Sequence, residues 1–520
     1  MLYFITFSIA ITALLSWFLM QKNETLAKLF RVMLAGAVLV YVVQMFAVDH
    51  LDVATKFGIA FRDLLVLGGV GIVGTILTRQ RLLSFPVVIA IIIVLQAFVL
   101  PRLSSSLEVG VMEDVDAQIE EARPFLPVHG LAEDGEFLVE IANSQDLNLL
   151  KLLQEQYGFT YEKAFSPNDV AQTTLDDFYV IDFDDTTDES TLDNFIYDVQ
   201  SRAQHFYIEN NEYITLDDME SRPVINKTNF TINDPGLEFS WGFTPMKMNE
   251  LYTFLQKTPL RPFKKARLAI LDTGIDAKHE DIAANYVSTQ KKYDDDPKGH
   301  GTHCAGIAAA VSNNRLGIAS YALNSDFVEV TSIKVLNSYG IGTQQGIIKG
   351  IIEAADSGTD VISMSLGGRS SDSKQRAYEK AVKYANKKGA IVIVAAGNSN
   401  RNAKDYAPAN SRGAITVTAI DDQLQRAMFS NYINDVDMGI AAPGVNIYSL
   451  IPGNQYAAYN GTSMATPYVS GLVAMMKSIN PEMTTEEVYQ ILNQTGIDTK
   501  NTTETGKLIQ PLRALQQILD

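Results

Sequence analysis

Long apolar runs dominate the first hundred residues of the chain. Residues 1–20 carry no charge, 32–48 and 85–100 are further uncharged apolar runs, and 64–78 form a shorter run rich in glycine. A helix that spans a bilayer needs about 20 mostly apolar residues. The pattern therefore predicts about four transmembrane helices in a membrane region over 1–102, which makes the lipid bilayer an expected partner.

Basic residues in the short loops predict the orientation of these helices, because cytoplasmic loops carry an excess of Lys and Arg. Five lie between the first two or the last two helices and three on the opposite side: the first set is Lys22, Lys28, Arg31, Arg79 and Arg81, and the second is Lys56, Arg62 and Arg102. The rest of the chain is therefore expected on the extracytoplasmic side. A cleaved signal peptide is the alternative for residues 1–20, although this run lacks a basic start.

A mixed pattern follows over 103–220. Residues 103–135 begin with serines, become acidic and predict a linker. Over 136–220, short strand-like runs are separated by two helical runs. The expected strands are 136–141, 160–165, 178–183 and a final strand or strand pair over 205–216, and the expected helices are 146–156 and 191–203. This βαββαβ order is typical of a ferredoxin-like α+β domain, and by itself it indicates no function.

The pattern changes from Arg267 onward. Strand-like apolar runs alternate with helical runs: the former include LAIL (268–271), VISMSL (361–366) and AIVIVAA (390–396), and the latter include 346–355 and 375–388. Such alternation predicts βαβ units and a doubly wound parallel sheet. The sequence thus predicts an α/β domain over 221–520.

The net charge of −18 is concentrated in the middle of the chain. Residues 1–102 hold 8 Lys+Arg and 4 Asp+Glu, 103–220 hold 4 and 28, and 221–520 hold 30 and 28. An acidic middle with a nearly neutral remainder argues against nucleic acid as a partner. The single cysteine, Cys304, rules out an intrachain disulfide framework.

Polar side chains follow the predicted strands of the α/β part, where open α/β sheets form their sites. Asp272 ends the LAIL strand, and Asn398 follows the AIVIVAA strand. Ser463 and His300 each stand at the start of an apolar helix. A serine nucleophile needs a base to take its proton, a carboxylate to orient that base and an amide donor for the oxyanion. These four residues supply those parts, and the chemistry requires no cofactor.

Five short blocks, in the order LDTGI, HGTHCAG, SLGG, AAGN and GTSMATP, resemble the signature blocks of the subtilisin-like serine proteases (subtilases, peptidase family S8). The strong match covers about 267–520, and NDP with a downstream Trp-Gly (233–242) resembles the start of mature members. The resemblance implies a subtilisin-like fold. It also assigns the catalytic roles: Asp272 as orienting acid, His300 as general base, Ser463 as nucleophile and Asn398 as oxyanion donor.

By the same resemblance, the substrate is a polypeptide that binds as an added strand. The implied substrate-binding segments are 339–342 and 365–367, with the residues Gly340, Gly342, Ser365, Leu366 and Gly367. The layout of 136–220 resembles the family's propeptide, an intramolecular chaperone and inhibitor. The expected protein is therefore a membrane-anchored serine endopeptidase made as a self-inhibited precursor, with a catalytic domain over 221–520.

The stretch KGHGTHCAG (298–306) raises two further possibilities, a metal site and a thiol nucleophile. Zinc takes three or four protein ligands, and no other His or Cys lies nearby in sequence. GTSMATP offers a better nucleophile than Cys304, so Cys304 is expected to pack beneath the histidine, and His303 is expected to be structural.

A structural calcium ion is a separate expectation from the resemblance. Residues 312–318 resemble the family's first calcium loop, with Asp281 and Asn314 as the implied side-chain ligands. Calcium takes six to eight oxygens, and an asparagine-rich turn without a metal is the alternative.

A different class of function stays open, a membrane sensor or transporter that carries an inactive protease fold. Against it, no catalytic position is substituted, and the membrane runs hold no charge pair that would mark a transport path. A role of the membrane region in docking a substrate protein is compatible with the protease interpretation.

Overall fold

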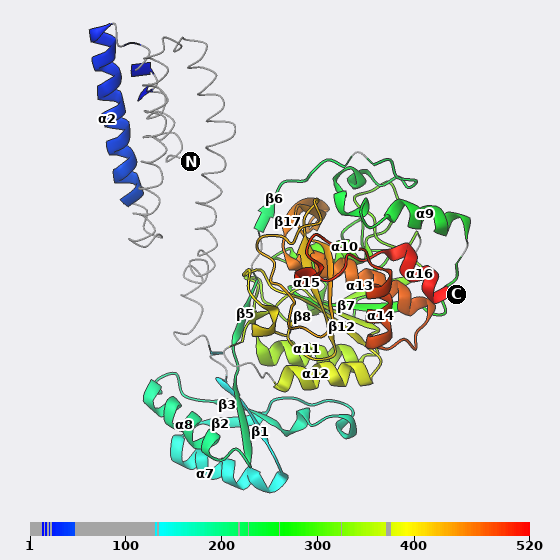
Figure 1. Cartoon of the computed structure of the whole chain (residues 1–520). Helices are drawn as coiled ribbons and strands as arrows, with labels where there is room; N and C mark the ends of the chain where they lie inside the picture. The colour runs from blue at the N-terminus through cyan, green and yellow to red at the C-terminus, as the bar shows by residue number, and fades with distance from the viewer. Residues whose placement is uncertain are drawn as a thin grey trace. The chain divides into compact units, whose positions relative to one another are not determined.

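The computed structural model describes part of the chain. The described residues are 13–14, 16–17, 20, 23–46, 131–132, 135–216, 219–226, 228–258, 260–323, 325–370 and 376–519. The chain divides into two compact units, 1–125 and 126–520. In the first unit the helix described is α2 (Glu24–Phe46), drawn blue in Figure 1.

The prediction of membrane helices finds no support in the described residues. None of the helices there combines the length and the apolar character needed to cross a bilayer. That result covers the described part of the run over 32–48. The runs over 1–20, 64–78 and 85–100 lie wholly or largely outside the described residues.

Residues 135–210 form the predicted α+β arrangement. The elements are β1 (Phe137–Ile141), α7 (Leu147–Tyr157), β2 (Thr160–Lys163), β3 (Phe178–Asp182), α8 (Glu189–Ser201) and β4 (Phe206–Asn210). The strands pair antiparallel in the order β2-β3-β1-β4. Phe195 of α8 packs with its ring centroid 5.1 Å from that of Phe159 and 5.2 Å from that of Phe183. The βαββαβ prediction is confirmed as a fold, here called the N-terminal α+β domain.

A six-stranded parallel sheet forms the centre of the remaining part. Its order is β15-β14-β12-β10-β7-β8. The strands are β7 (Ala266–Asp272), β8 (Val328–Lys334), β10 (Val361–Met364), β12 (Ile391–Ala395), β14 (Ala414–Ile420) and β15 (Gly439–Pro443). β10, β12 and β14 are buried along their whole length. Parallel strands covered on both faces read as continuous apolar runs, and this explains the lack of alternation in VISM and IVIVA.

Helices cover both faces of this sheet (Figure 1). α10 (His300–Ala309) and α13 (Thr462–Ile479) lie on one face, and α11 (Gln344–Asp356) and α12 (Arg376–Lys387) on the other. α10 and α13 cross closely, because a Cβ added at Gly471 would lie 2.4 Å from the carbonyl oxygen of Ala308. The predicted doubly wound α/β sheet is confirmed.

Small sheets and further helices complete the unit. They are β5 (Tyr213–Thr215), β6 (Met219–Ser221), β9 (Ile341–Thr343), β11 (Gly368–Arg369), β13 (Tyr406–Ala407), β16 (Ile447–Ile451), β17 (Gln455–Asn460), α9 (Met248–Lys257), α14 (Thr485–Thr495), α15 (Thr502–Thr505) and α16 (Pro511–Leu519).

The N-terminal α+β domain shares one hydrophobic core with the part of the chain that contains the six-stranded parallel sheet. Phe165, Phe178 and Val180 of the first belong to the same buried cluster as Ile348 of α11 and Tyr378 of α12. The expected final strand pair of the α+β domain also divides. β4 stays in its own sheet, whereas β5 pairs antiparallel with β9.

Candidate active site

Three of the predicted side chains lie at the carboxyl ends of neighbouring strands. Asp272 is the last residue of β7, Ser365 follows β10, and Asn398 follows β12. β12, β10 and β7 are adjacent in the sheet. Because parallel strands end at one edge, these residues, far apart in sequence, meet at a single site.

His300 opens α10 and faces Asp272. Its Nδ1 lies 2.7 Å from Oδ1 and 2.8 Å from Oδ2 of Asp272, and both side chains are fully buried. A carboxylate held in this way selects the tautomer with a proton on Nδ1. Nε2 then points away from Asp272 and is the nitrogen suited to accept a proton.

Ser463 is the second residue of α13 and is 6% exposed. Its hydroxyl donates to the backbone oxygen of Ser365 at 3.2 Å. The Sγ of Cys304 lies 4.0 Å from Nε2 of His300 and 3.5 Å from the backbone oxygen of Ser463. Cys304 thus contacts both residues. Cys304 therefore links the buried Asp272–His300 pair to the backbone of Ser463.

Asn398 is oriented by a residue that the sequence did not single out. Its Oδ1 accepts hydrogen bonds from the backbone N–H and the hydroxyl of Thr462, at 2.8 and 2.9 Å. Since Thr462 directly precedes Ser463, these bonds hold the amide beside the start of α13 with Nδ2 as its donor end. A side-chain donor next to a serine at a helix N-terminus is suited to stabilise an oxyanion.

The neighbours of His300 do not form a metal or thiolate site. The ligand atoms of Asp272, His300 and Cys304 lie within 4.8 Å of one another, but the first two residues already bond to each other. Burial raises the pKa of Cys304, which keeps it a thiol. Burial lowers the pKa of His303 to about 3, and its Nε2 lies 3.1 Å from the backbone oxygen of Ala457, so a structural role fits.

The predicted substrate-binding segment 339–342 contacts the chain itself. Gly342 of β9 is paired with Ile214 of β5. The N–H of Leu216 donates to the backbone oxygen of Gly340 at 3.1 Å. β5 also lies beside β11, which directly follows Gly367. The two predicted segments therefore flank residues 213–216, with Leu366 buried in the shared core.

A second strand, β6, pairs with the strand that precedes Ser463 in the chain. β6 pairs antiparallel with β17, with Met219 opposite Asn460. Asn460 precedes Ser463 by only three residues. Strands β5 and β6 thus pair with two different strands of the α/β domain, β9 and β17, and this arrangement was not predicted from the sequence.

The predicted calcium ligands meet in one loop. Asn314 donates from Nδ2 to Oδ1 of Asp281 at 2.7 Å, and Oδ2 of Asp281 accepts from the N–H of Ile318 at 2.8 Å. Asp234, which was not predicted as a ligand, accepts from the N–H groups of Asn313 and Asn314 at 2.8 and 3.1 Å. The sequence feature that contains Asp234 is the NDP motif at 233–235.

Two acidic side chains, Asp234 and Asp281, contact this loop. Asp281 is fully buried, and burial raises its pKa to about 7. Within the described part of the chain, no Lys, Arg or His forms an ion pair with Asp234 or Asp281. Backbone N–H groups of the loop donate to both carboxylates, so the geometry is compatible with an asparagine-rich turn as well as with a divalent ion held by oxygen ligands.

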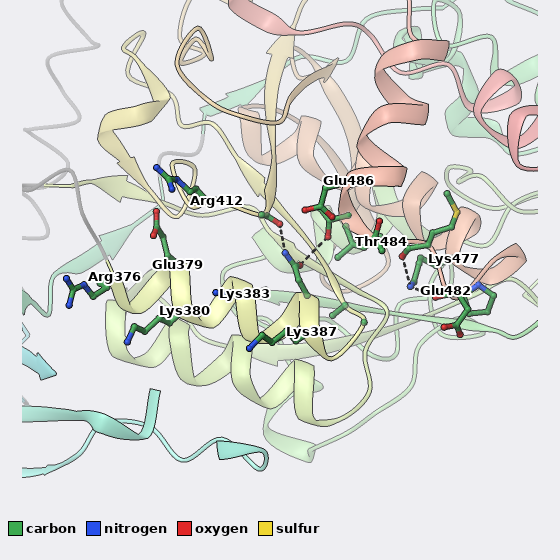
Figure 2. A pocket seen from close by; sticks show the side chains of 18 residues that line it. Arg376, Glu379, Lys380, Lys383, Lys387, Arg412, Lys477, Glu482, Thr484 and Glu486 are labelled. Carbon is green, nitrogen blue, oxygen red and sulfur yellow. Dashed lines mark hydrogen bonds between the residues drawn. The ribbon is translucent and has the colours of Figure 1, made fainter. Parts of the chain in front are cut away.

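A pocket among the described residues is separate from this site. This pocket of about 880 Å³ is lined by α12, residues 389–391 and 412–413, and the start of α14. Figure 2 shows Arg376, Lys380, Lys383 and Lys387 of α12 along it. None of the triad residues lines this pocket.

Comparisons with known proteins agree with this geometry. Residues 264–510 match the model of the Subtilase family. Over 218 residues, 41% of this chain and 75% of the relative, the chain is 43% identical to thermitase from Thermoactinomyces vulgaris. It is 39% identical to subtilisin DY from Bacillus licheniformis over 48% of this chain and 90% of the relative. It is 41% identical to the thermostable alkaline protease of Halalkalibacterium halodurans over 44% of this chain and 62% of the relative.

Proposed function

Because the chain belongs to the subtilase family and is a serine endopeptidase, we propose that it cleaves polypeptides with the triad Asp272, His300 and Ser463 and is made as a self-inhibited precursor. The observation that carries the catalytic assignment is the buried contact between Asp272 and Nδ1 of His300, with Cys304 in contact with both His300 and Ser463.

Catalysis then follows from the arrangement of these side chains. The hydroxyl oxygen of Ser463 attacks the scissile carbonyl carbon, and its proton passes to Nε2 of His300. Asp272 stabilises the imidazolium that forms. Asn398 donates from Nδ2 to the oxyanion of the tetrahedral intermediate. His300 returns the proton to the leaving amine, and a water molecule activated by the same imidazole hydrolyses the acyl-enzyme at Ser463.

A fluorophosphonate probe tests this assignment, because it reacts covalently with an activated serine. We expect the wild-type protein to be labelled and Ser463→Ala to lose the label. Ser470→Ala is a matched control, since Ser470 lies on the same helix and donates to Thr466 and Ser363 instead. Equal labelling of wild type and Ser463→Ala would refute the catalytic role of Ser463.

The self-inhibited state is supported by the position of β5 and β6. β5 occupies the strand position beside β9 that the resemblance assigns to substrate, and added strands are a common mode of peptide recognition. β6 pairs with β17, which ends at Asn460, three residues before Ser463. In this proposal the chain crosses its own active site, and the N-terminal α+β domain is its propeptide.

Contacts with the helices α11 and α12 support the inhibitory role of this domain. Glu209 of β4 accepts from the N–H groups of Arg376 and Ala377, at 3.0 and 3.3 Å, at the start of α12. Asn211 accepts from the N–H of Gln345 at 2.9 Å, at the start of α11. The domain thereby satisfies N–H groups that a helix leaves unpaired at its amino end.

Self-cleavage would allow β5, β6 and the N-terminal α+β domain to leave the active site. We propose that it occurs between Leu216 and Asp234, and the positions of β5 and β6 favour the interval between these two strands. Purified Ser463→Ala should stay full length, whereas wild type yields two fragments whose new amino terminus mass spectrometry can identify. Identical gel patterns would refute self-cleavage without affecting the protease assignment.

The acidic loop is the proposed site of a structural calcium ion. Asp281, Asn314 and Asp234 would hold it through side-chain oxygens, with Asn314 turning its amide oxygen toward the ion. The ion takes no part in the proton transfers at Ser463. Titration of the protein with calcium, followed by its melting temperature, tests the site.

Anchoring of the chain by residues 1–102 is a further part of the proposal. It is supported by the uncharged apolar runs in the sequence and by the distribution of Lys and Arg between them. The catalytic domain would then lie on the extracytoplasmic side. Membrane fractionation, with protease added to intact cells, tests both points. Full-length protein that is washed from membranes by carbonate would contradict the anchor.

A further inference from the structure

A buried carboxylate lies behind the Asp272–His300 pair and has no part in the mechanism described so far. Asp296 is 2% exposed. Its Oδ1 accepts from the hydroxyl of Thr273 at 2.7 Å and from the N–H of Gly299 at 2.9 Å. Its Oδ2 accepts from the N–H and the hydroxyl of Thr302, at 2.8 and 2.7 Å. Four donors therefore converge on one side chain.

These donors belong to the start of the helix that carries His300. The N-cap residue of α10 is Gly299, which has no side chain and a φ of 91°. The first N–H groups of a helix need partners from outside the helix. Asp296 supplies one for Thr302, and the hydroxyl oxygen of Thr273 supplies one for Gly301 at 3.1 Å. Asp296, three residues before the N-cap in the sequence, thus caps the helix in place of the side chain that Gly299 lacks.

The same carboxylate also reaches the strand that carries Asp272. Thr273 bonds to Asp296 through its hydroxyl, and its backbone N–H donates to Oδ1 of Asp272 at 2.7 Å. The helix and the strand end are in tight contact, because a Cβ added at Gly301 would lie 2.1 Å from the carbonyl oxygen of Gly274. Asp296 is therefore connected by hydrogen bonds both to the end of the strand that carries Asp272 and to the start of the helix that carries His300.

We propose that Asp296 is a positioning residue for catalysis. Through its hydrogen bonds to Thr302 and Thr273, it keeps the imidazole of His300 and the carboxylate of Asp272 within hydrogen-bonding distance of each other. It touches neither the nucleophile nor the substrate in this proposal. Proton transfer depends on sub-ångström placement of the base, so loss of Asp296 lowers turnover more than it lowers substrate binding. The proposal rests on the protease assignment.

The test compares steady-state kinetics of Asp296→Asn with those of wild type on one peptide substrate. Asparagine keeps the size of the side chain, but it presents an NH2 group to N–H donors. We expect kcat to fall by about tenfold or more, with KM within about threefold of the wild-type value, at temperatures well below unfolding.

A matched control separates positioning from general stability. Asp360 is 6% exposed and accepts from the N–H of Arg267 at 2.9 Å, near the other end of β7. Asp360→Asn should lower the melting temperature while kcat stays at the wild-type value. If Asp296→Asn and Asp360→Asn change only the melting temperature, the proposal is wrong.

A second variant keeps the test decisive if Asp296→Asn fails to fold. Thr273→Val removes the hydroxyl that links Asp296 to Gly301 and leaves the shape of the side chain. We expect a smaller fall in kcat with an unchanged KM. Wild-type kcat in Thr273→Val would overturn the proposed link. Loss of activity in Ser463→Ala remains the separate test of the protease assignment itself.

Discussion

The carboxylate of Glu140 on β1 lies 3.3 Å from the guanidinium of Arg376 on α12. Lys380, one turn further along α12, forms an ion pair with the same carboxylate, which is only 12% exposed. The N-terminal α+β domain lies within the acidic block 103–220, and it meets the cationic side of α12 at this point. The contact joins the proposed propeptide to the helix that it covers.

We predict that reversing the charge of Glu140 loosens this domain. Glu140→Lys, in a Ser463→Ala background that prevents cleavage, places three cations together and should speed hydrogen exchange in β1 and at the start of α12. Partly exposed ion pairs contribute modestly, about 0.2–1 kcal/mol each, so the expected change in exchange rate is several-fold, and it should shrink in high salt.

A double variant in which the charges of the ion pair are swapped provides the control for this prediction. Glu140→Lys combined with Lys380→Glu should recover part of the lost protection. Lys383 lies on the same helix and has no ion pair with the α+β domain among the described residues, so Lys383→Glu should change little. Equal exchange in all four proteins would show that charge does not hold the domain.

Asp272→Asn tests the role of the orienting carboxylate. Both oxygens of Asp272 lie within 2.8 Å of Nδ1 of His300, and asparagine can present its NH2 group there and stabilise the wrong imidazole tautomer. Loss of the triad carboxylate in this way lowers kcat by about 10⁴. Burst kinetics on an ester substrate should show slow acylation, whereas a normal burst would remove Asp272 from the mechanism.

Asn398→Ala tests the oxyanion donor. Because the donor acts in the transition state, kcat should fall by about 10²–10³ with little change in KM. Thr462→Val removes the hydroxyl that bonds to Oδ1 of Asn398 but keeps the backbone N–H, and should therefore cost much less. Near wild-type turnover of Asn398→Ala on a peptide substrate would exclude this role.

The residues of the proposed active site could be located in the sequence because each stands at or near the beginning or end of a regular element. Asp272 closes an apolar strand, and His300 opens a helix, so pattern and motif coincide. Thr462 and Asp296 could not be found in this way. Their roles depend on which loop atoms they contact. Hydrogen bonds such as that from Gly299 to Asp296 cannot be read from the spacing of apolar residues in the sequence.

The partner of β5 was equally hidden in the sequence. The residue pattern at 213–215 predicts a strand, but such a pattern does not predict which strand it pairs with. The sequence predicted a final strand or strand pair of the α+β domain over 205–216. The structure pairs Tyr213 with Thr343 of another domain, because β9 has no other strand partner among the described residues.

The proposed calcium site makes a prediction about pH. In the folded state the pKa of Asp281 is raised to about 7 from its ordinary value near 3.8, mainly by burial. Between these two values the folded protein binds more protons at Asp281 than the unfolded chain does. Without calcium, stability therefore falls as pH rises from about 4 to 7 and levels off above that.

Calcium should reverse this loss, because it binds the ionised form of Asp281 and stabilises the folded state in proportion to its occupancy. The melting temperature in millimolar calcium relative to a chelator should rise by several degrees at pH 8 and by less at pH 5. Asp281→Asn should abolish both the pH slope and the calcium effect. Magnesium is the control ion, since it requires a smaller octahedral site. Identical melting with calcium and with chelator at both pH values would leave the loop as an asparagine-rich turn.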